Sequence, residues 1–314
     1  MVGRIEGRGF DSLSAEEVQE LPLLYRAAMS SLSVARNILL DRNLLLYLEN
    51  LCLRAYLAVY GPRLGLGRTF LRFLSHDFPR AVRALRPHLL AVTVALLAGT
   101  LAGYLLVHSD PHYFSLIVPE SLAGSRGPES SAEDLIRTEL FAPWPGFVET
   151  FVIFANSLFR HNTLVGLLSF GLGFALGLPT VLLVAYNGLI MGAFLALHAE
   201  LGLAVDFLGW LSIHGVTEIL AVLLCGAAGL RVAEKIIFPG DLPRLDSLAL
   251  YGRRAASVAA GAVILFFIAG FLEGGFRPLI SQTAGRYAVA LVTAAAWLFY
   301  FTRLGREADH GAER

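Results

Sequence analysis

The sequence has few charged residues for its length and no excess of either sign. Charged residues make up 16% of the 314 positions, and 25 Lys and Arg balance 25 Asp and Glu. A typical soluble domain carries about a quarter charged residues, and a nucleic-acid-binding domain carries a basic excess. The composition therefore argues against an ordinary soluble enzyme and indicates no nucleic-acid partner.

Cysteine is also scarce, while apolar residues are abundant. Cys52 and Cys225 lie far apart, so they form neither a disulfide framework nor a CxxC metal or redox pair. Apolar residues make up 56% of the chain and the mean hydropathy is +0.63. These values predict an integral protein of the lipid bilayer. Nothing in the sequence indicates a cofactor.

Hydropathy divides the chain into three parts. Residues 10–86 are predicted to form a cytoplasmic amphipathic helical subdomain, whose first helix is capped by Ser14 and Glu17. Residues 87–302 are predicted to form a transmembrane bundle with a polar extracytoplasmic loop at 110–146, and residues 303–314 a cytoplasmic tail. The predicted fold class is an all-α, polytopic transmembrane helix bundle.

Six spans are expected within the bundle, and the first of them, residues 87–109, is long enough to cross about 30 Å of hydrocarbon. They cover residues 87–109, 161–178, 180–201, 214–232, 255–272 and 286–301. Residues 204–213 are expected to form a connecting segment. Residues 147–160 are too short to span, and a re-entrant or interfacial helix is expected there.

The distribution of basic residues predicts the orientation. Arg and Lys are frequent in 63–86, in 231–254 and in the C-terminal tail, but loop 110–146 holds only Arg126 and Arg137. Basic residues concentrate on the cytoplasmic side of membrane proteins. We therefore expect a multi-pass protein of the cell membrane with both termini in the cytoplasm.

Glycines recur in pairs within the expected spans, which predicts close helix packing. The pairs and the glycines near Cys225 are Gly99, Gly103, Gly173, Gly177, Gly188, Gly192, Gly226, Gly229, Gly270 and Gly274. The pattern does not say whether the contacts lie within one chain or between chains. A homo-oligomer is one expectation that follows.

Polar residues within the apolar region are candidates for function, because an ionisable group at the centre of a membrane helix costs roughly 2.5–3.5 kcal/mol. His214 and Glu218 are four residues apart and share a helix face. They could form a structural clasp, a proton or ion conduit, or a metal or catalytic site. Two ligands are too few for zinc, and Glu149, His161 or His198 would have to supply a third. The candidate residues are His214, Glu218, Asn187, Asn156, Glu149 and Glu273.

Several segments resemble the stage II sporulation protein M family of multi-span membrane proteins. They are the region of Asn156, GLLSFGLGFALG, YNGLIMG at 186–192, HGVTEILAVLLCGAAGL at 214–230, and the sequence FLEGG that contains Glu273. The resemblance implies a bacterial-type membrane protein that takes part in an envelope or membrane assembly with partner proteins. It implies no catalytic residues.

Three functions follow from these observations. The first is a scaffold or assembly component of a membrane or cell-envelope complex. The second is a transporter or channel that uses the intramembrane polar residues. The third is an intramembrane hydrolase, for which the sequence offers no nucleophile motif and no HExxH. The decisive observation is whether the polar residues line a cavity or are buried in protein contacts.

Overall fold

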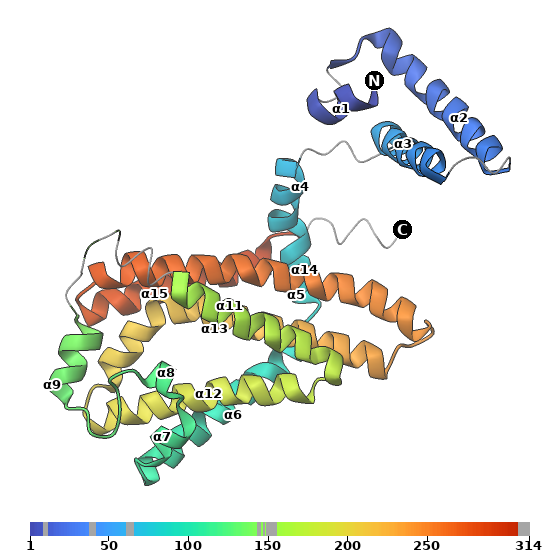
Figure 1. Cartoon of the computed structure of the whole chain (residues 1–314). Coiled ribbons are helices and arrows are strands. Elements are labelled where there is room, and N and C mark those ends of the chain that lie inside the picture. The colour runs from blue at the N-terminus through green and yellow to red at the C-terminus, as the bar shows by residue number, and fades with distance from the viewer. Residues whose placement is uncertain are drawn as a thin grey trace. The chain divides into compact units, whose positions relative to one another are not determined.

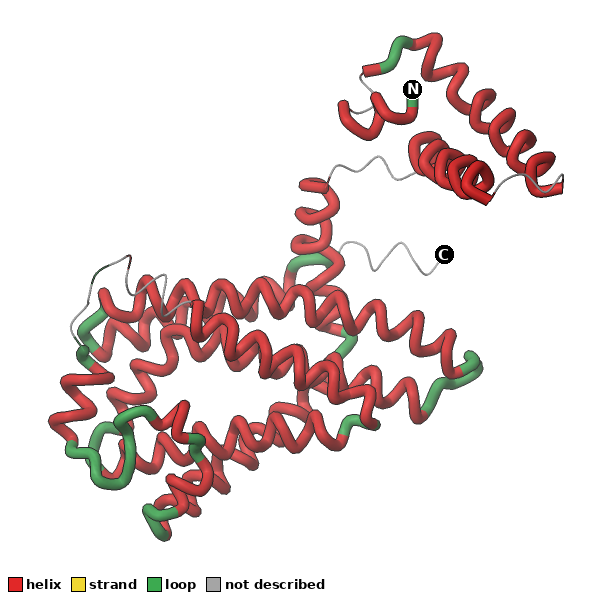
Figure 2. Tube along the Cα trace, in the orientation of Figure 1, coloured by secondary structure: helices red, strands yellow, loops and turns green. Residues whose placement is uncertain are grey.

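The computed structural model describes residues 1–8, 12–37, 42–60, 66–142, 146, 148 and 156–306. The chain forms two compact units, Met1–Phe70 and Leu71–Arg314. Throughout the described residues, every regular element is a helix (Figure 2). The prediction of an all-α polytopic helix bundle is confirmed, since several helices of the second unit are long and apolar enough to cross a membrane.

The first unit consists of α1 (Val2–Arg8), α2 (Ala15–Asn37) and α3 (Arg42–Tyr60). The capping box at the start of α2 is present: the Ser14 amide donates to Glu17 at 3.0 Å, and the Glu17 amide donates to the Ser14 hydroxyl at 3.2 Å. Leu32 and Cys52 are among the residues buried within this unit. Its core is small, because most large apolar side chains of α2 and α3 are exposed.

The boundary between the units falls earlier than the sequence analysis placed it. The predicted subdomain ran to residue 86, but the second unit begins at Leu71. It opens with the end of α4 (Leu66–Arg72), the π-turn η2 (Phe73–Asp77) and α5 (Phe78–Arg83). Phe78 is only 1% exposed and packs against Phe301 with ring centroids 5.5 Å apart. The apolar face of α5 is therefore buried on the bundle.

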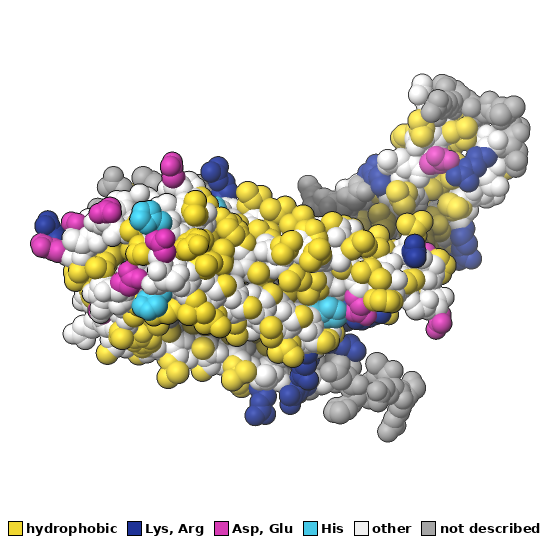
Figure 3. Space-filling view, turned by 90° about the horizontal axis from the view of Figure 1, so that it is seen from below, with side chains coloured by type: hydrophobic (Ala, Val, Ile, Leu, Met, Phe, Trp, Pro, Cys, Tyr) yellow, Lys and Arg dark blue, Asp and Glu magenta, His cyan; other side chains and the backbone are white. Residues whose placement is uncertain are grey.

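Six long helices make up the bundle of the second unit (Figure 1). They are α6 (Arg86–Ser109), α11 (Asn156–Gly171), α12 (Leu178–Glu200), α13 (Ala204–Ile237), α14 (Arg244–Phe271) and α15 (Thr283–Arg303). The 3-10 turn η5 (Leu172–Ala175) extends α11, and the π-turn η6 (Leu272–Phe276) extends α14. Apolar side chains cover the middle of the bundle surface, and acidic and histidine side chains gather at one end (Figure 3).

Five of these helices meet the length and hydropathy of a membrane span, and α11 is the exception within the described residues. It has 16 α-helical residues followed by the 4 residues of η5. Together they extend about 32 Å, from about 1.5 Å per α-helical residue and about 2 Å per 3-10 residue. This length matches the hydrocarbon core of a bilayer.

Glycine contacts give the relative directions of two pairs of helices. Gly99 and Gly103 of α6 lie against Ala185 and Leu189 of α12, so the two helices run parallel. The chain between the end of α6 and the start of α12 must therefore run back to the side where α6 began. The long helix in this part of the sequence is α11. Gly166 of α11 lies near Cys225, and Gly173 of the following turn η5 lies on Gly229. By the same reasoning, α11 runs parallel to α13.

The glycine pairs lie at these close contacts. A Cβ on Gly99 or Gly103 would overlap a carbonyl oxygen of α12, and one on Gly188 or Gly192 would overlap a carbonyl oxygen of α6. Gly226 faces Val184 and Val92, and Gly229 faces Ser169. Gly177 adopts φ +81° in the turn before α12. Gly270 and Gly274 are buried. These contacts lie within one chain, so they supply no argument for a homo-oligomer, which stays a prediction.

Two segments expected outside the spans belong at least in part to long helices. Residues 204–213, expected as a connecting segment, belong to the 34-residue helix α13. The chain continues as a helix there because nothing in that stretch breaks it: Gly209 packs against Thr283 and Tyr287. Of the expected re-entrant segment 147–160, only Val148 and residues 156–160 lie within the described residues, the latter in α11.

The expected polar loop at 110–146 is largely folded. Residues 110–142 contain α7 (Tyr113–Ile117), α8 (Glu120–Ala123), α9 (Ala132–Leu135) and the π-turn η3 (Ile136–Leu140). Their buried apolar residues, such as Phe114 and Leu135, form a second hydrophobic core with Phe194 and Phe207. The acidic residues of this segment make its sequence polar on average, but its apolar residues pack over one end of the bundle.

Candidate functional site

Three ionisable side chains meet inside the bundle. His214 and Glu218 project from one face of α13, and Glu273 projects from the π-turn that ends α14. Nε2 of His214 lies 3.5 Å from Oε1 of Glu273. One potential ligand atom from each of the three residues lies within 4.8 Å of the others. Among the described residues, the pair predicted from the sequence is thus completed by Glu273, and not by His161 or His198; Glu149 lies outside the described residues.

Arg277 compensates part of the negative charge of this group. Its Nη1 donates to Oε1 of Glu273 at 2.6 Å, and its guanidinium lies 4.5 Å from the centre of the Trp210 ring. The π-turn η6 lies between the end of α14 and Arg277, and π-turns occur frequently at functional sites. The turn buries Glu273, which is 4% exposed, so its ion pair with Arg277 is shielded from water.

Glu218 has no comparable partner. Within the described part of the chain, no hydrogen bond or ion pair joins its carboxylate to another residue, although Glu273 and Arg277 are near enough to affect it electrostatically. A carboxylate in such a position is unfavourable unless it is protonated or meets water or a cation. Glu218 is therefore the group of this site that most needs an additional ligand.

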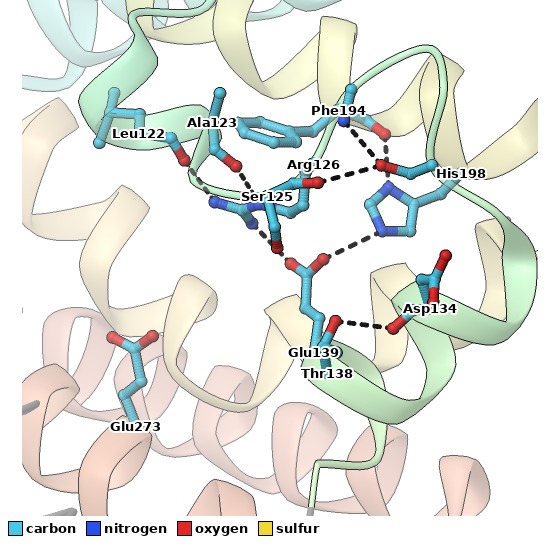
Figure 4. A network of polar contacts seen from close by, with 12 residues as sticks. Leu122, Ala123, Ser125, Arg126, Asp134, Thr138, Glu139, Phe194, His198 and Glu273 are labelled. Atoms are coloured by element: carbon cyan, nitrogen blue, oxygen red, sulfur yellow. Dashed lines mark hydrogen bonds and ion pairs between the residues drawn. The ribbon is translucent and has the colours of Figure 1, made fainter.

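A second polar cluster lies where segment 110–142 meets the bundle. Nη1 of Arg126 donates to Oε1 of Glu139 at 2.6 Å, and Nε2 of His198 lies 3.5 Å from Oε2 of the same carboxylate. Figure 4 shows Arg126 and His198 approaching Glu139 from two sides. The Arg126 guanidinium also lies 4.3 Å from the centre of the Phe194 ring.

Glu139 is held in its charged form by these neighbours. Burial alone would raise the pKa of Glu139, but the His198 ring and the positive charge of Arg126 outweigh it and lower the pKa below its ordinary value of 4.5. Its carboxylate therefore stays ionised at neutral pH. Arg126 and Glu139 thus form a fixed ion pair, with Glu139 on the π-turn η3.

A partly open cavity of about 250 Å³ connects the two clusters. Its polar lining includes Arg126 from the second cluster, and His214, Glu218 and Glu273 from the first. Apolar residues such as Phe194 and Trp210 form most of the remaining wall. The cavity is smaller than the roughly 300–1,000 Å³ pockets that hold drug-sized ligands. It therefore suits an ion or a small hydrophilic solute.

The remaining candidates are distributed as follows. Asn187 lines the cavity, and its amide donates to the Leu183 carbonyl of the same helix at 2.8 Å, so α12 is not broken there. His161 lines the cavity as well. Glu149 lies outside the described residues, and the side chain of Asn156 is not described. His214 and Glu218 both line the cavity, but no hydrogen bond between the two is among those of the described residues.

The sequence analysis did not single out Arg126, Glu139 or Arg277 as site residues. Arg277 follows Glu273 by four residues, which is the spacing of a helical ion pair and could have been recognised. Arg126 and Glu139 gave no such signal. They lie in a segment that resembles a solvated loop, and only its packing on α12 brings Arg126 to the cavity and Glu139 to His198.

The comparisons with known proteins place the chain in a family. The sequence pattern described as Stage II sporulation protein M matches residues 92–278, which is more than half of the chain and includes every residue of the two clusters. A domain of unknown function (DUF8413) matches residues 2–61, the larger part of the first unit. Comparisons with curated proteins and with solved structures give no match. On the match to residues 92–278, this membrane protein belongs to the stage II sporulation protein M family.

Proposed function

We propose that the protein is a membrane transporter or channel that admits an ion or a small hydrophilic solute to the cavity between its two polar clusters. The single observation that carries this proposal is the cavity of about 250 Å³, whose lining includes His214, Glu218 and Glu273 within helices of membrane-spanning length. Ionisable groups at such a depth are characteristic of ion and substrate pathways.

A scaffold alone does not require this arrangement. Polar residues that only hold helices together form mutual hydrogen bonds and leave no space between them. Here the Glu218 carboxylate faces a cavity, and no hydrogen bond or ion pair to another protein group is present for it among the described residues. The hydrolase alternative is weaker, because the described residues that line the cavity include no Ser, Thr or Cys as a nucleophile.

The orientation is part of the proposal. The distribution of basic residues predicts that both termini lie in the cytoplasm and that segment 110–142 lies outside, in a multi-pass protein of the cell membrane. Arg126 and Glu139 would then stand at the outer end of the cavity. His214, Glu218 and Glu273 would stand deeper in the membrane, so that a solute from outside meets the Arg126–Glu139 pair first.

Cysteine accessibility tests the proposal. In a chain that lacks Cys52 and Cys225, a cysteine at Met191, which lines the cavity, is expected to react with a membrane-impermeant thiol reagent added outside. A cysteine at the fully buried Val184 of the same helix is the matched control and should not react. Lack of reaction at Met191, with normal reaction at Ser125 in the outer segment, would contradict a solute-accessible cavity.

A role in membrane assembly is the second candidate, and the first unit favours it. Large apolar side chains of α2 and α3 are exposed, including Leu23, Leu53 and Leu57 at 60%, 59% and 56%. An exposed apolar face of this kind is typical of a protein interaction site. A photo-crosslinker at Leu53 is expected to join one defined envelope or membrane protein, and Leu57→Asp should abolish the crosslink. Crosslinks that are unspecific, or unchanged by Leu57→Asp, would count against a scaffold.

A further inference from the structure

The inner polar cluster has the composition of a metal site. We propose that His214, Glu218 and Glu273 bind one divalent first-row transition-metal ion, and that this ion is the solute of the cavity; the second statement rests on the proposed transport function. One imidazole nitrogen and two carboxylate oxygens form a mixed ligand set that Zn²⁺, Mn²⁺ and Fe²⁺ accept. The candidate ligand atoms lie within 4.8 Å of one another.

The distances require only a small closure of the site. Ligand atoms bound to one metal at about 2.1 Å are separated by at most about 4.2 Å. The largest separation of 4.8 Å exceeds this limit by less than 1 Å. Glu218 lines the cavity, so rotation about its side-chain bonds can bring the carboxylate to the other two ligands without moving a helix.

The state of His214 independently indicates a missing ligand. Its side chain is 5% exposed, and Nδ1 is buried with no hydrogen-bond partner among the described residues. Buried polar atoms nearly always have a partner, and an exception calls for an unrecorded water, ion or ligand. An ion or a water beside Nδ1 would supply that partner; an ion held by Nε2, which lies 3.5 Å from Glu273, would leave Nδ1 to a water.

The charge of the site also permits a cation. With a neutral imidazole and both carboxylates ionised, the two carboxylates and Arg277 leave one uncompensated negative charge inside the bundle. A divalent cation reverses that excess and gives Glu218 the partner it otherwise lacks. Magnesium fits the site less well, because it prefers oxygen ligands alone and retains most of its water.

Arg277 acts as an internal competitor for the metal. It binds Oε1 of Glu273 at 2.6 Å, so it occupies one of the oxygens that the ion would use. The ion must displace Arg277 from that oxygen or use Oε2 instead. Arg277 is thus a positioning residue that keeps the affinity moderate, which a transported ion requires for release.

Metal binding to the full-length protein in lipid nanodiscs tests the site. Mn²⁺ and Zn²⁺ are the probes, with binding followed by calorimetry and by electron paramagnetic resonance of Mn²⁺. One ion per chain is expected, and millimolar Mg²⁺ should not displace it. His214→Gln, Glu218→Gln and Glu273→Gln should each weaken binding at least 10-fold, and Arg277→Gln should strengthen it. Glu200→Gln, in the partly exposed pair with His108, is the matched control and should bind like the parent.

Folding is controlled separately. Glu218→Asp keeps the charge and shortens the side chain by one methylene, so it should fold normally and still bind more weakly. The metal site is refuted if the parent binds no more Mn²⁺ or Zn²⁺ than a Glu218→Gln/Glu273→Gln variant. It is also refuted if folded Glu218→Asp and Glu218→Gln both bind like the parent.

The metal site and the transport function can fail independently. If Met191→Cys is accessible from outside but no metal binds, the cavity stands and the metal assignment falls. If metal binds but Met191→Cys never reacts, the site stands as a closed structural site and the transport function falls. Uptake of Mn²⁺ into proteoliposomes that contain the parent, with loss of uptake in Glu218→Gln, would support both.

Discussion

Arg277 donates from Nη1 to Oε1 of Glu273 at 2.6 Å, across the end of the π-turn that terminates α14. Glu273 thereby has a cationic partner within an apolar bundle, next to His214 and Glu218. The same pair connects packing and function, because the carboxylate that Arg277 stabilises is also the proposed metal ligand.

Removal of Arg277 alone should destabilise the protein more than removal of both partners. Arg277→Gln leaves the Glu273 carboxylate buried without its cation, which costs about 3 kcal/mol in buried pairs. The double variant Arg277→Gln/Glu273→Gln should regain most of that loss. Thermal unfolding in detergent at neutral pH measures both. Equal destabilisation by the single and double variants would mean that the ion pair is not the source.

Acid should weaken the attachment of segment 110–142 to the bundle. The pKa of Glu139 is lowered in the folded protein, so its contribution to stability is complete above its ordinary value of 4.5 and is lost as the pH falls through the lowered folded pKa. Thermal unfolding measured from pH 7 to pH 3 should therefore show a smaller acid loss in Glu139→Gln than in the parent. Glu120→Gln, at an exposed position, is the control and should follow the parent.

The contact between α6 and α12 should tolerate no added methyl group. A Cβ at Gly99 would overlap the Ala185 carbonyl oxygen, so Gly99→Ala forces the helices apart and should cost about 1–3 kcal/mol. Gly171→Ala in α11 meets nothing within 4 Å and should leave the unfolding temperature unchanged or slightly raised. Similar losses in both variants would point to a general intolerance of glycine replacement.

The orientation can be measured with single cysteines. In a background without Cys52 and Cys225, a cysteine at Ser125 should react with an impermeant reagent added outside intact cells. A cysteine at Leu245, which is 80% exposed at the start of α14, should react only after the membrane is opened. Reaction at Leu245 alone in intact cells would reverse the proposed topology.

The sequence alone determined the class of the fold and the sites of closest helix packing. Charge scarcity and long apolar runs predict membrane helices because each backbone polar group must be satisfied within the helix in lipid. Paired glycines such as Gly99 and Gly103 predict close contacts because only a missing side chain allows two backbones to approach. The spacing of four residues between His214 and Glu218 predicts a shared face, because helix periodicity places such residues on one side of the helix.

Only the tertiary structure decided which groups share the cavity. Glu273 reaches His214 because α14 packs on α13 and its π-turn turns the carboxylate inward, which no local spacing encodes. Arg126 and Glu139 reach His198 because apolar residues of segment 110–142 are buried on α12. Contacts between residues distant in sequence depend on the packing of whole helices, whereas helix periodicity depends on a few neighbouring residues. The class of the protein and the three residues of the inner cluster were therefore readable from the chain, whereas their meeting and the outer cluster were not.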